Sequence, residues 1–495
     1  MFEGSLVSDG ALNALSAVDS DINLSVGTAA TLNTLSLTGE SVLQVDLDPN
    51  SGTIPATLTV TGNATLGENV IIRPDLQSIS STDFTHTVID AGTLSFAGTL
   101  DDTQVSGIPF LYQVELVVNE DTRDTLDLQF SLKSTEELGL DFNQTAAFEA
   151  VLDVFSNDSE LGAALADITE ESEFQQTYSL LLPQRTDAAT RYLSSQGSAA
   201  FGALGNRLKT IENSAERPRS VWAQEYATVI DIEAETDVPG YNGSGLGFAT
   251  GIDSRFGPLD VAGLYINYSS GDFEKKTGGS NPVTTSAFGV GLYAKESLGP
   301  LDFMIASQVS SVTFNSRREV EIGEFTYLQS GEWKGTSAMT SASVSSRFEA
   351  GQFYARPQVS FDFFQLDQDG YSETGDDRLA MEVGASETDR STATAVLDIG
   401  ARWQIGRQNP AYIIPEISMG YRSELSSTPY QTTARFLGSE ETFEIISQET
   451  FSDAFLAGIS LSTDSVMGSA RFGYDIEVAA EGLIHFGGAM LKLKF

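Results

Sequence analysis

The stretch FYARPQVSFDF, residues 353–363, alternates between two kinds of side chain. The odd-numbered positions, from Phe353 to Phe363, are all apolar. The even-numbered positions carry a tyrosine, an arginine, a glutamine, a serine and an aspartate. Because successive side chains of an extended chain point to opposite faces, this stretch predicts a β-strand with one apolar face and one polar face.

The same alternation returns from residue 221 to the end of the chain. It also marks the last stretch, GGAMLKLKF at 487–495, where apolar positions alternate with lysines. The pattern predicts twelve strands, at about 221–233, 243–256, 259–269, 283–296, 299–315, 333–348, 352–365, 391–406, 410–423, 451–463, 465–478 and 482–495.

The connections between these strands also alternate, in length. FGPLD, ESLGP and EAGQ are short, whereas SSGDFEKKTGGSNP and DQDGYSETGDDRLAMEVGASETDR are long and polar. An even number of strands with short turns at one end and long loops at the other is typical of an outer-membrane barrel. A soluble β-sandwich also has alternating strands, but it does not explain this regular alternation of connections.

In such a barrel the apolar faces meet lipid and the polar faces meet the lumen. Several charged residues are expected to face the lumen as a network of ion pairs: Arg356, Asp362, Asp398, Arg402, Glu416, Arg422, Lys492 and Lys494. Large aromatic residues are expected at interfacial girdles: Trp222, Tyr265, Tyr293, Tyr354, Trp403 and Phe495.

The chain before residue 221 has three textures. Residues 1–132 are short β-rich runs broken by turn residues, which favours the stacked coils of a β-helix (solenoid). Residues 133–185 contain short helices, and 186–220 contain a longer one with Phe201, Leu204 and Leu208 on one face. The predicted fold class is therefore all-β: a twelve-stranded antiparallel transmembrane barrel at 221–495, preceded by a helical linker through its lumen and a β-helical stem.

Composition excludes several functions. The 495 residues include 69 acidic and 27 basic side chains, for a net charge of −42, so nucleic-acid binding is not expected. No apolar run is long enough for a transmembrane helix. The start, MFEGSLVSDG, lacks the features of a signal peptide, so we expect the natural protein to be longer at its N-terminus.

No catalytic or cofactor site is expected. The two histidines, His86 and His485, lack the partners of a Ser-His-Asp triad or a zinc site, and there is no cysteine. The stretch DLDPNSG at 46–52 resembles the start of a calcium loop, but Ser51 and Thr57 stand where glycine and glutamate are required. A solenoid turn is the better interpretation.

Three regions together resemble a bacterial autotransporter (type V secretion). KSTEELGLDFNQTAAFEAVLDVF at 133–155 is similar to the junction after a passenger, and YSLLLPQRTDAATRYLSSQGSAAFGALGNRL at 178–208 is similar to the linker helix. VWAQEYATVID at 221–231 resembles a first barrel strand, and LKLKF at 491–495 resembles the terminal motif.

The resemblance implies an outer-membrane translocator that exports its N-terminal passenger to the cell surface and anchors it there. A surface-anchored adhesin or display protein whose passenger stays attached is the alternative. The implied partners are outer-membrane lipid and lipopolysaccharide, periplasmic chaperones, the Bam barrel-assembly machinery, and a host or surface ligand of the passenger. The resemblance makes Leu491, Leu493 and Phe495 an assembly signal.

Some members of the family release their passenger by cyclisation of an asparagine in the linker helix. The candidates are Asn206 and Asn213, but neither lies in a paired-asparagine context. We therefore expect no self-cleavage and no enzymatic activity in this chain.

Overall fold

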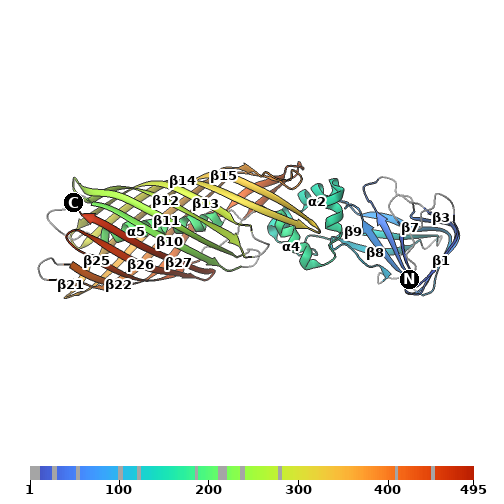
Figure 1. Ribbon diagram of the computed structural model, residues 1–495, viewed down its shortest axis with the longest axis horizontal. Helices are drawn as coiled ribbons and strands as arrows, with labels where there is room; N and C mark the ends of the chain where they lie inside the picture. Colours follow the sequence, from blue (N-terminus) through green and yellow to red (C-terminus); the bar gives the residue numbers. More distant parts are fainter. Residues whose placement is uncertain are drawn as a thin grey trace.

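The computed structural model describes residues 12–24, 30–51, 56–98, 104–119, 124–183, 188–209, 220–234, 240–276, 281–406, 411–446 and 452–494. Figure 1 shows an elongated molecule with a β-barrel at one end and a stack of shorter strands at the other. Helices lie between the two, and one further helix lies inside the barrel.

The barrel is a closed antiparallel sheet of twelve strands, as the sequence predicts. Its strands are β10 (Ser220–Ile232), β11 (Tyr241–Phe256), β12 (Leu259–Lys275), β13 (Val283–Leu298), β14 (Leu301–Ile322), β15 (Phe325–Ser346), β17 (Phe353–Gln368), β20 (Ser386–Ala401), β22 (Ala411–Ser427), β25 (Ala454–Asp464), β26 (Gly468–Ala479) and β27 (Gly482–Lys494). Two short strands lengthen the sheet: β16 (Phe348–Ala350) pairs with β17, and β21 (Trp403–Ile405) pairs with β22.

Closure is made by the first and last strands. β10 pairs with β27 along its whole length, from Ser220 opposite Lys494 to Ile232 opposite Gly482. The tight turns, such as those at Gly257, Gly299 and Gly351, lie at the same end as Ser220, and each of these glycines has a positive φ. We call this end the turn end and the opposite one the loop end.

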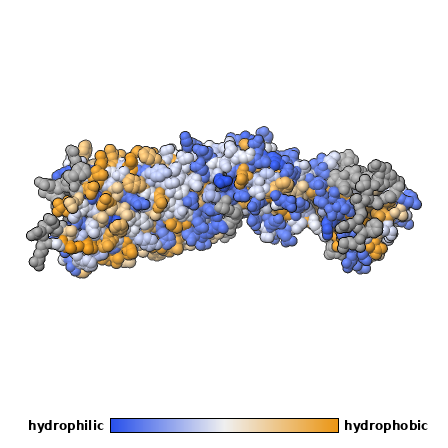
Figure 2. All heavy atoms as spheres, viewed as in Figure 1, coloured by the Kyte–Doolittle hydropathy of each residue, from blue (hydrophilic) through white to orange (hydrophobic). Residues whose placement is uncertain are grey.

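The outer face of the barrel is apolar near the turn end and polar towards the loop end (Figure 2). On β14 the outward side chains from Leu301 to Val309 include four exposed apolar residues, whereas those from Ser311 to Glu321 are polar or charged. Nine residues of strand are enough to cross a bilayer at the usual tilt. The polar half of the strand therefore projects beyond any apolar layer.

The β14–β15 hairpin is longer than the sequence predicted. Residues 316–332 were expected to form a loop, but both strands continue to a tight turn at Gly323. The reason is visible in the alternation itself, because Arg318, Val320 and Ile322 are buried while Glu319 and Glu321 are exposed. The buried side chains pack on helices that the strand pattern alone does not show.

The long connection predicted at 367–390 also contains strands. It contains β18 (Tyr371–Ser372) and β19 (Met381–Val383). These two strands form a separate four-stranded sheet at the loop end with β23 (Gln431–Phe436) and β24 (Thr442–Ile446), which follow β22. Together with residues 316–332 of the β14–β15 hairpin, this sheet forms what we call the collar.

The N-terminal stack consists of two sheets with a shared apolar core. In the first, β1 (Leu12–Val18), β3 (Ala30–Thr38), β5 (Leu58–Leu66) and β7 (Phe84–Phe96) pair in parallel, and β9 (Thr125–Leu132) and β8 (Tyr112–Val118) complete it antiparallel. The second contains the parallel strands β2 (Asp21–Leu24), β4 (Val42–Leu47) and β6 (Ile71–Leu76). Equivalent leucines, such as Leu37 and Leu66, lie in register and are buried.

Four junction helices join the stack to the barrel: α1 (Phe142–Ala146), α2 (Phe148–Asn157), α3 (Ser159–Ala166) and α4 (Glu171–Leu181). The Asp141 side chain caps α1 in a reciprocal capping box with Gln144. Phe110 of the stack packs on Phe174 of α4, with 5.3 Å between ring centroids, and its backbone N–H bonds the Ile168 carbonyl. Among the described residues, no helix has both the length and the hydrophobicity to cross a bilayer.

His86 gives the stack a sensitivity to pH. Its side chain is 3% exposed on β7, and its Nε2 lies 2.7 Å from the Thr57 hydroxyl. Burial lowers the pKa of His86 to about 4 from its ordinary value of 6.5, against the weaker opposing effect of Asp127. Because the unfolded chain binds the proton more readily, the stability contributed by neutral His86 is present above pH 6.5 and is lost as the pH falls towards 4.

We expect the stack to lose about 3 kcal/mol of unfolding free energy between pH 6.5 and 4 through this residue. Hydrogen exchange of β7 and β9 amides, corrected for the intrinsic effect of pH, measures the loss. The variant His86→Gln keeps a polar partner for Thr57 but does not titrate, so its profile is expected to be flatter. Equal pH profiles for the two proteins would contradict the prediction.

Candidate functional site

The lumen of the barrel contains helix α5 (Ala188–Lys209). At 22 residues the helix is about 33 Å long, and it contacts β10, β11, β12, β15 and β27. The described part of the chain therefore enters the barrel at the loop end, passes along the lumen, and begins β10 at the turn end.

At the loop end, α5 is held by a buried ion pair. The Arg191 guanidinium lies 2.6 Å from the Glu481 carboxylate, and both side chains are buried. Beside it the Thr190 and Thr388 hydroxyls are 2.7 Å apart. The Tyr192 hydroxyl donates to the Ser244 carbonyl oxygen at 3.1 Å. Pairing a buried charge avoids most of the cost of removing it from water.

At the turn end, a second buried cation holds the helix. Arg207 donates to the Asp253 carboxylate at 2.5 Å and to the Ser220 hydroxyl at 2.6 Å. The Tyr293 hydroxyl donates to the same carboxylate at 2.7 Å and accepts from the Trp222 indole at 2.7 Å. The Ser220 hydroxyl also donates to Asp253, at 2.8 Å, so this carboxylate receives hydrogen bonds from the helix and from two strands, which fixes the helix end relative to the barrel wall.

The large aromatic side chains near this site lie inside the barrel, not at its outer girdles. Trp222, Tyr265, Tyr293 and Tyr354 are all buried, so the predicted girdle position of these four is wrong. The reason is steric: their rings cover glycines of neighbouring strands. A Cβ at Gly291 would lie 2.2 Å from the Tyr265 ring. Trp403 is exposed on the outer face as expected, and Phe495 lies outside the described residues.

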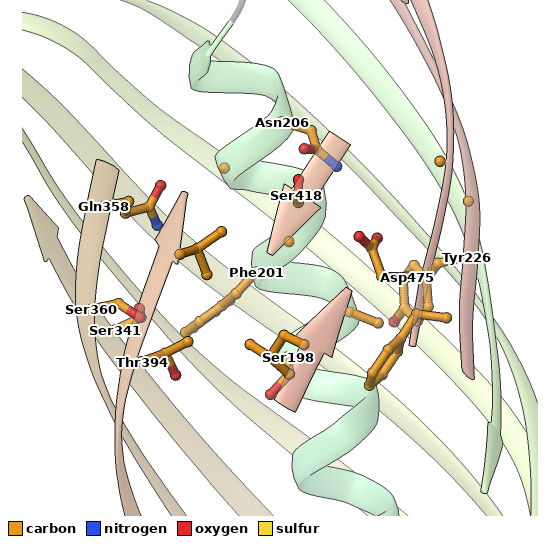
Figure 3. A pocket seen from close by; sticks show the side chains of 18 of the residues that line it. Ser198, Phe201, Asn206, Tyr226, Ser341, Gln358, Ser360, Thr394, Ser418 and Asp475 are labelled. Carbon is orange, nitrogen blue, oxygen red and sulfur yellow. The ribbon is translucent and has the colours of Figure 1, made fainter. Parts of the chain in front are cut away.

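The middle of α5 does not fill the lumen. A cavity of about 280 Å³ separates one face of the helix from strands on the far wall. Ser198, Phe201 and Asn206 line it from the helix, and Figure 3 shows Phe201 extending toward Ser341, Ser360 and Thr394 of the barrel. Gly202 and Gly205 also line the cavity, and a Cβ on either would meet no atom within 4 Å.

The charges predicted for the lumen occupy different places. Asp362, Asp398 and Arg422 line the cavity, and Arg422 also pairs with Glu477 at 2.6 Å. Glu416 is buried and accepts from Arg471 at 2.9 Å.

Arg356 lies 4.0 Å from the Glu416 carboxylate and 5.6 Å from the Tyr354 ring centroid. Arg402 lies where β20 gives way to β21, with its guanidinium 3.6 Å from the Tyr412 ring centroid. Lys492 is buried, and the side chain of Lys494 lies outside the described residues.

The remaining predicted residues divide between the two faces of the wall. Leu491 and Leu493 are 57% and 55% exposed on the outer face of β27. Asn206 faces the lumen cavity from α5. Asn213 lies outside the described residues.

The residues that hold α5 were largely missed from the sequence. The predicted set of lumen charges did not include Arg191, Asp253 or Glu481. A signal exists for the aromatic part of the site. Tyr293 shares its strand parity with Gly291 and Lys295, whereas Val290 and Leu292 have the opposite parity. That parity places the tyrosine on the polar, inward face.

Within the described ranges, no group of three or more His, Asp or Glu side chains is arranged to hold a metal ion. The described lumen contains paired charges, hydroxyls and amides around a helix. This arrangement positions a segment of polypeptide inside a closed barrel.

Comparison with known proteins shows which family this chain belongs to. The family model described as the autotransporter beta-domain matches residues 221–478, more than half of the chain. The chain belongs to the autotransporter β-domain family. It is accordingly an outer-membrane translocator.

Solved structures similar to this autotransporter chain include three from the same class of protein. The translocator domain of the autotransporter NalP from Neisseria meningitidis is 13% identical, with a TM-score of 0.46, covering 61% of this chain and 98% of that one. The β domain of the Bordetella autotransporter BrkA is 15% identical, with a TM-score of 0.41, covering 56% and 100%. The transport unit of AIDA-I from Escherichia coli is 10% identical, with a TM-score of 0.36, covering 60% and 98%. No curated protein sequence matches the chain.

Two glycines are expected to respond in opposite ways to the same substitution. Gly205→Ala adds a methyl group to open space and improves helix propensity, so it should stabilise α5 by about 0.5–1 kcal/mol. Gly271→Ala places the methyl group 1.8 Å from the Tyr192 hydroxyl and 2.1 Å from the Ser244 carbonyl oxygen, which should destabilise the barrel by about 1–3 kcal/mol. The temperature at which the barrel loses its compact form on electrophoresis measures both. A loss of stability in Gly205→Ala would contradict the placement of the cavity.

Removing the turn-end cation is expected to loosen α5. In Arg207→Met the Asp253 carboxylate stays buried without its cation, at a cost of about 3–5 kcal/mol. We expect a higher ion conductance in planar bilayers and a lower unfolding temperature. Arg317→Met, which removes an exposed arginine of β14, is the control and should change neither. A variant Arg207→Met that conducts like the parent would show that the pair does not hold the helix.

Proposed function

We propose that this chain carries its N-terminal part through its own barrel and then anchors that part at the cell surface. One observation carries the proposal. The stack and junction lie at the loop end, β10 begins at the turn end, and α5 joins the two through the lumen of a closed barrel. Such a connection forms when the chain is threaded through the barrel, or when the barrel closes around it. The turn end is then periplasmic and the loop end faces outwards.

The outer face supports a transmembrane position for the barrel. Exposed apolar side chains such as Leu264, Phe288 and Val309 form the band near the turn end. Outer-membrane barrels carry an apolar band of about 25 Å, and bilayer lipid is the partner that such a surface requires. Lipopolysaccharide would be the lipid on the outer side.

The last strand is the proposed assembly signal. Leu491 and Leu493 present apolar side chains outwards on β27, next to the seam with β10. With Phe495 they would be recognised by the Bam barrel-assembly machinery after delivery by periplasmic chaperones. Recognition at this strand has a physical advantage, because β27 is the last edge to be paired when the barrel closes.

The N-terminal stack is the proposed end of a β-helical passenger. Its parallel strands place equivalent apolar positions in register from one strand to the next, which supports a solenoid. Stacking each coil on the one already outside would bias transport outwards, since every added coil buries apolar surface. The proposed division of the chain is then a stem at 1–132, a junction at 133–185, a pore helix at 186–220 and a barrel at 221–495.

A second function is favoured by one group of contacts. Side chains of the junction helices contact the collar, among them Asn143 and Asp153. These contacts hold the stem in one position on the barrel. This favours a surface-anchored display protein or adhesin whose passenger stays attached and meets a host or surface ligand. Passenger in the culture medium would distinguish a released product from an attached one.

Protease protection in intact cells tests the export proposal. Epitope tags are placed in the stack turn after Asp48 and in the exposed segment at 369–370, at the edge of the collar, and cells are treated with external protease. We expect both tags to be lost, leaving a resistant, heat-modifiable barrel that is cut only at the collar tag. An otherwise identical chain with the tag in the turn at 299–300 should keep its tag until the outer membrane is permeabilised. Protection of the stack and collar tags in intact cells would overturn the proposal.

A further inference from the structure

The collar and the junction helices share an interface that neither barrel closure nor the lumen helix requires. Its centre is Arg318 on β14, whose side chain is completely buried. The Arg318 Nε donates to the Glu373 carboxylate at 3.0 Å, and Nη2 donates to the same carboxylate and to the Leu379 carbonyl at 2.8 Å. These partners all belong to the collar or its connecting segments.

The remaining nitrogen of Arg318 points at the junction. Nη1 donates to the carbonyl oxygens of Leu180 and Leu181, at 3.1 and 3.3 Å. These carbonyls belong to the last turn of α4, which has no basic residue of its own. The C-terminal carbonyls of a helix lack partners within the helix and carry partial negative charge. The barrel therefore supplies the cation that the end of α4 needs.

A second contact joins α1 to the edge of the collar sheet. The Asn143 side chain donates to the Ile446 carbonyl at 3.0 Å and accepts from the Ile446 N–H at 2.9 Å. An amide side chain thus completes the hydrogen bonds of β24 as a neighbouring strand would. Asp153 of α2 accepts a hydrogen bond from the Ser439 hydroxyl, so a third helix position is also fixed.

The rim of the interface carries charge pairs. Arg378 lies 3.4 Å from both the Asp158 and the Glu160 carboxylates of the junction, and 2.9 Å from Asp376 of its own segment. Its guanidinium also lies 5.2 Å from the Tyr327 ring centroid. These pairs are partly exposed, so they contribute less than the buried Arg318 contacts.

We propose that the collar is a binding site for the junction helices, and that it retains the N-terminal stack on the barrel without a covalent connection. Arg318 is the central residue of this site, because Glu373 and Leu379 orient its guanidinium and leave Nη1 directed at α4. The inference rests on the proposed function, in which the stack is the passenger side of the molecule. Cleavage between α4 and α5 would then leave the stack bound to the barrel.

Cleavage of the purified full chain tests this directly. The recognition sequence of a site-specific protease is inserted between Pro183 and Ala188, an affinity tag is added at the N-terminus, and the protein is kept in detergent micelles. After cutting, we expect the barrel to remain with the tagged stack through immobilisation and washing. Immediate release of the barrel from the cut parent protein would overturn the proposal.

Two substitutions test which residues bind the junction helices to the collar. Arg318→Met leaves Glu373 and the α4 carbonyls buried without their cation, so we expect release to be about 100-fold faster or more. Asn143→Ala removes the β24 contact without burying an unpaired charge and should speed release by about 10-fold. If Arg318→Met disturbs folding, Asn143→Ala still decides the question. Release from both variants at the parental rate would overturn the assignment of the site.

The matched control is Arg347→Met. Arg347 pairs with Glu349 at 2.9 Å and lies over the Tyr354 ring at the turn end, away from the collar. It should leave the release rate unchanged, and the heat-modifiable form should be retained in every variant. Failure of surface protease accessibility in cells would count against the proposed function alone. The cut-and-release assay in micelles does not depend on export.

Discussion

The pairing of β10 with β27 turns the sheet of the translocator into a closed surface, and the other features of the barrel depend on it. In a lipid environment an open strand edge would leave a row of backbone N–H and C=O groups without partners, each costing several kcal/mol. Thirteen residue pairs, from Ser220 with Lys494 to Ile232 with Gly482, remove that edge. Closure also creates an interior, and the interior has to be filled by groups that satisfy one another.

Helix α5 fills the interior of the barrel unevenly along its length. Its two ends are fixed by buried ion pairs, Arg191 with Glu481 and Arg207 with Asp253. Its middle faces a cavity across Gly202 and Gly205. A helix held at its two ends and loosely packed at its centre is consistent with the proposed passage of the chain through the lumen. Tight packing along its whole length would need a lumen with no spare room for an extended chain.

At the loop end, buried polar contacts also hold the structure together outside the apolar band. The β14–β15 hairpin and the four-stranded sheet rise beyond it, where acidic side chains such as Glu319 and Glu321 remain in water. Inward side chains of β14 bury against α3 and α4, and Arg318 joins strand, collar and helix in one site. The stack is therefore connected to the barrel twice, through the covalent chain into α5 and through the collar.

The sequence by itself determined the strands. Alternation is a local property with a period of two, so the twelve strands, their antiparallel connections and the outward position of Leu491 and Leu493 follow from short windows. The same alternation carried the inward parity of Tyr293, which the expectation of aromatic girdles overrode. It also continued through Arg318, Val320 and Ile322, in a stretch between two of the predicted strands.

Only the tertiary structure decided which residues meet. Arg207 and Asp253 are 46 positions apart, and Arg191 and Glu481 are 290 apart. No periodicity within a strand specifies such partners, because they are set by the shear of the closed barrel and by the depth at which α5 comes to rest. The same holds for Arg318 and the end of α4. An arginine in an alternating strand is assigned to one face by its sequence, but the carbonyls that accept its hydrogen bonds arrive only when the junction folds onto the collar.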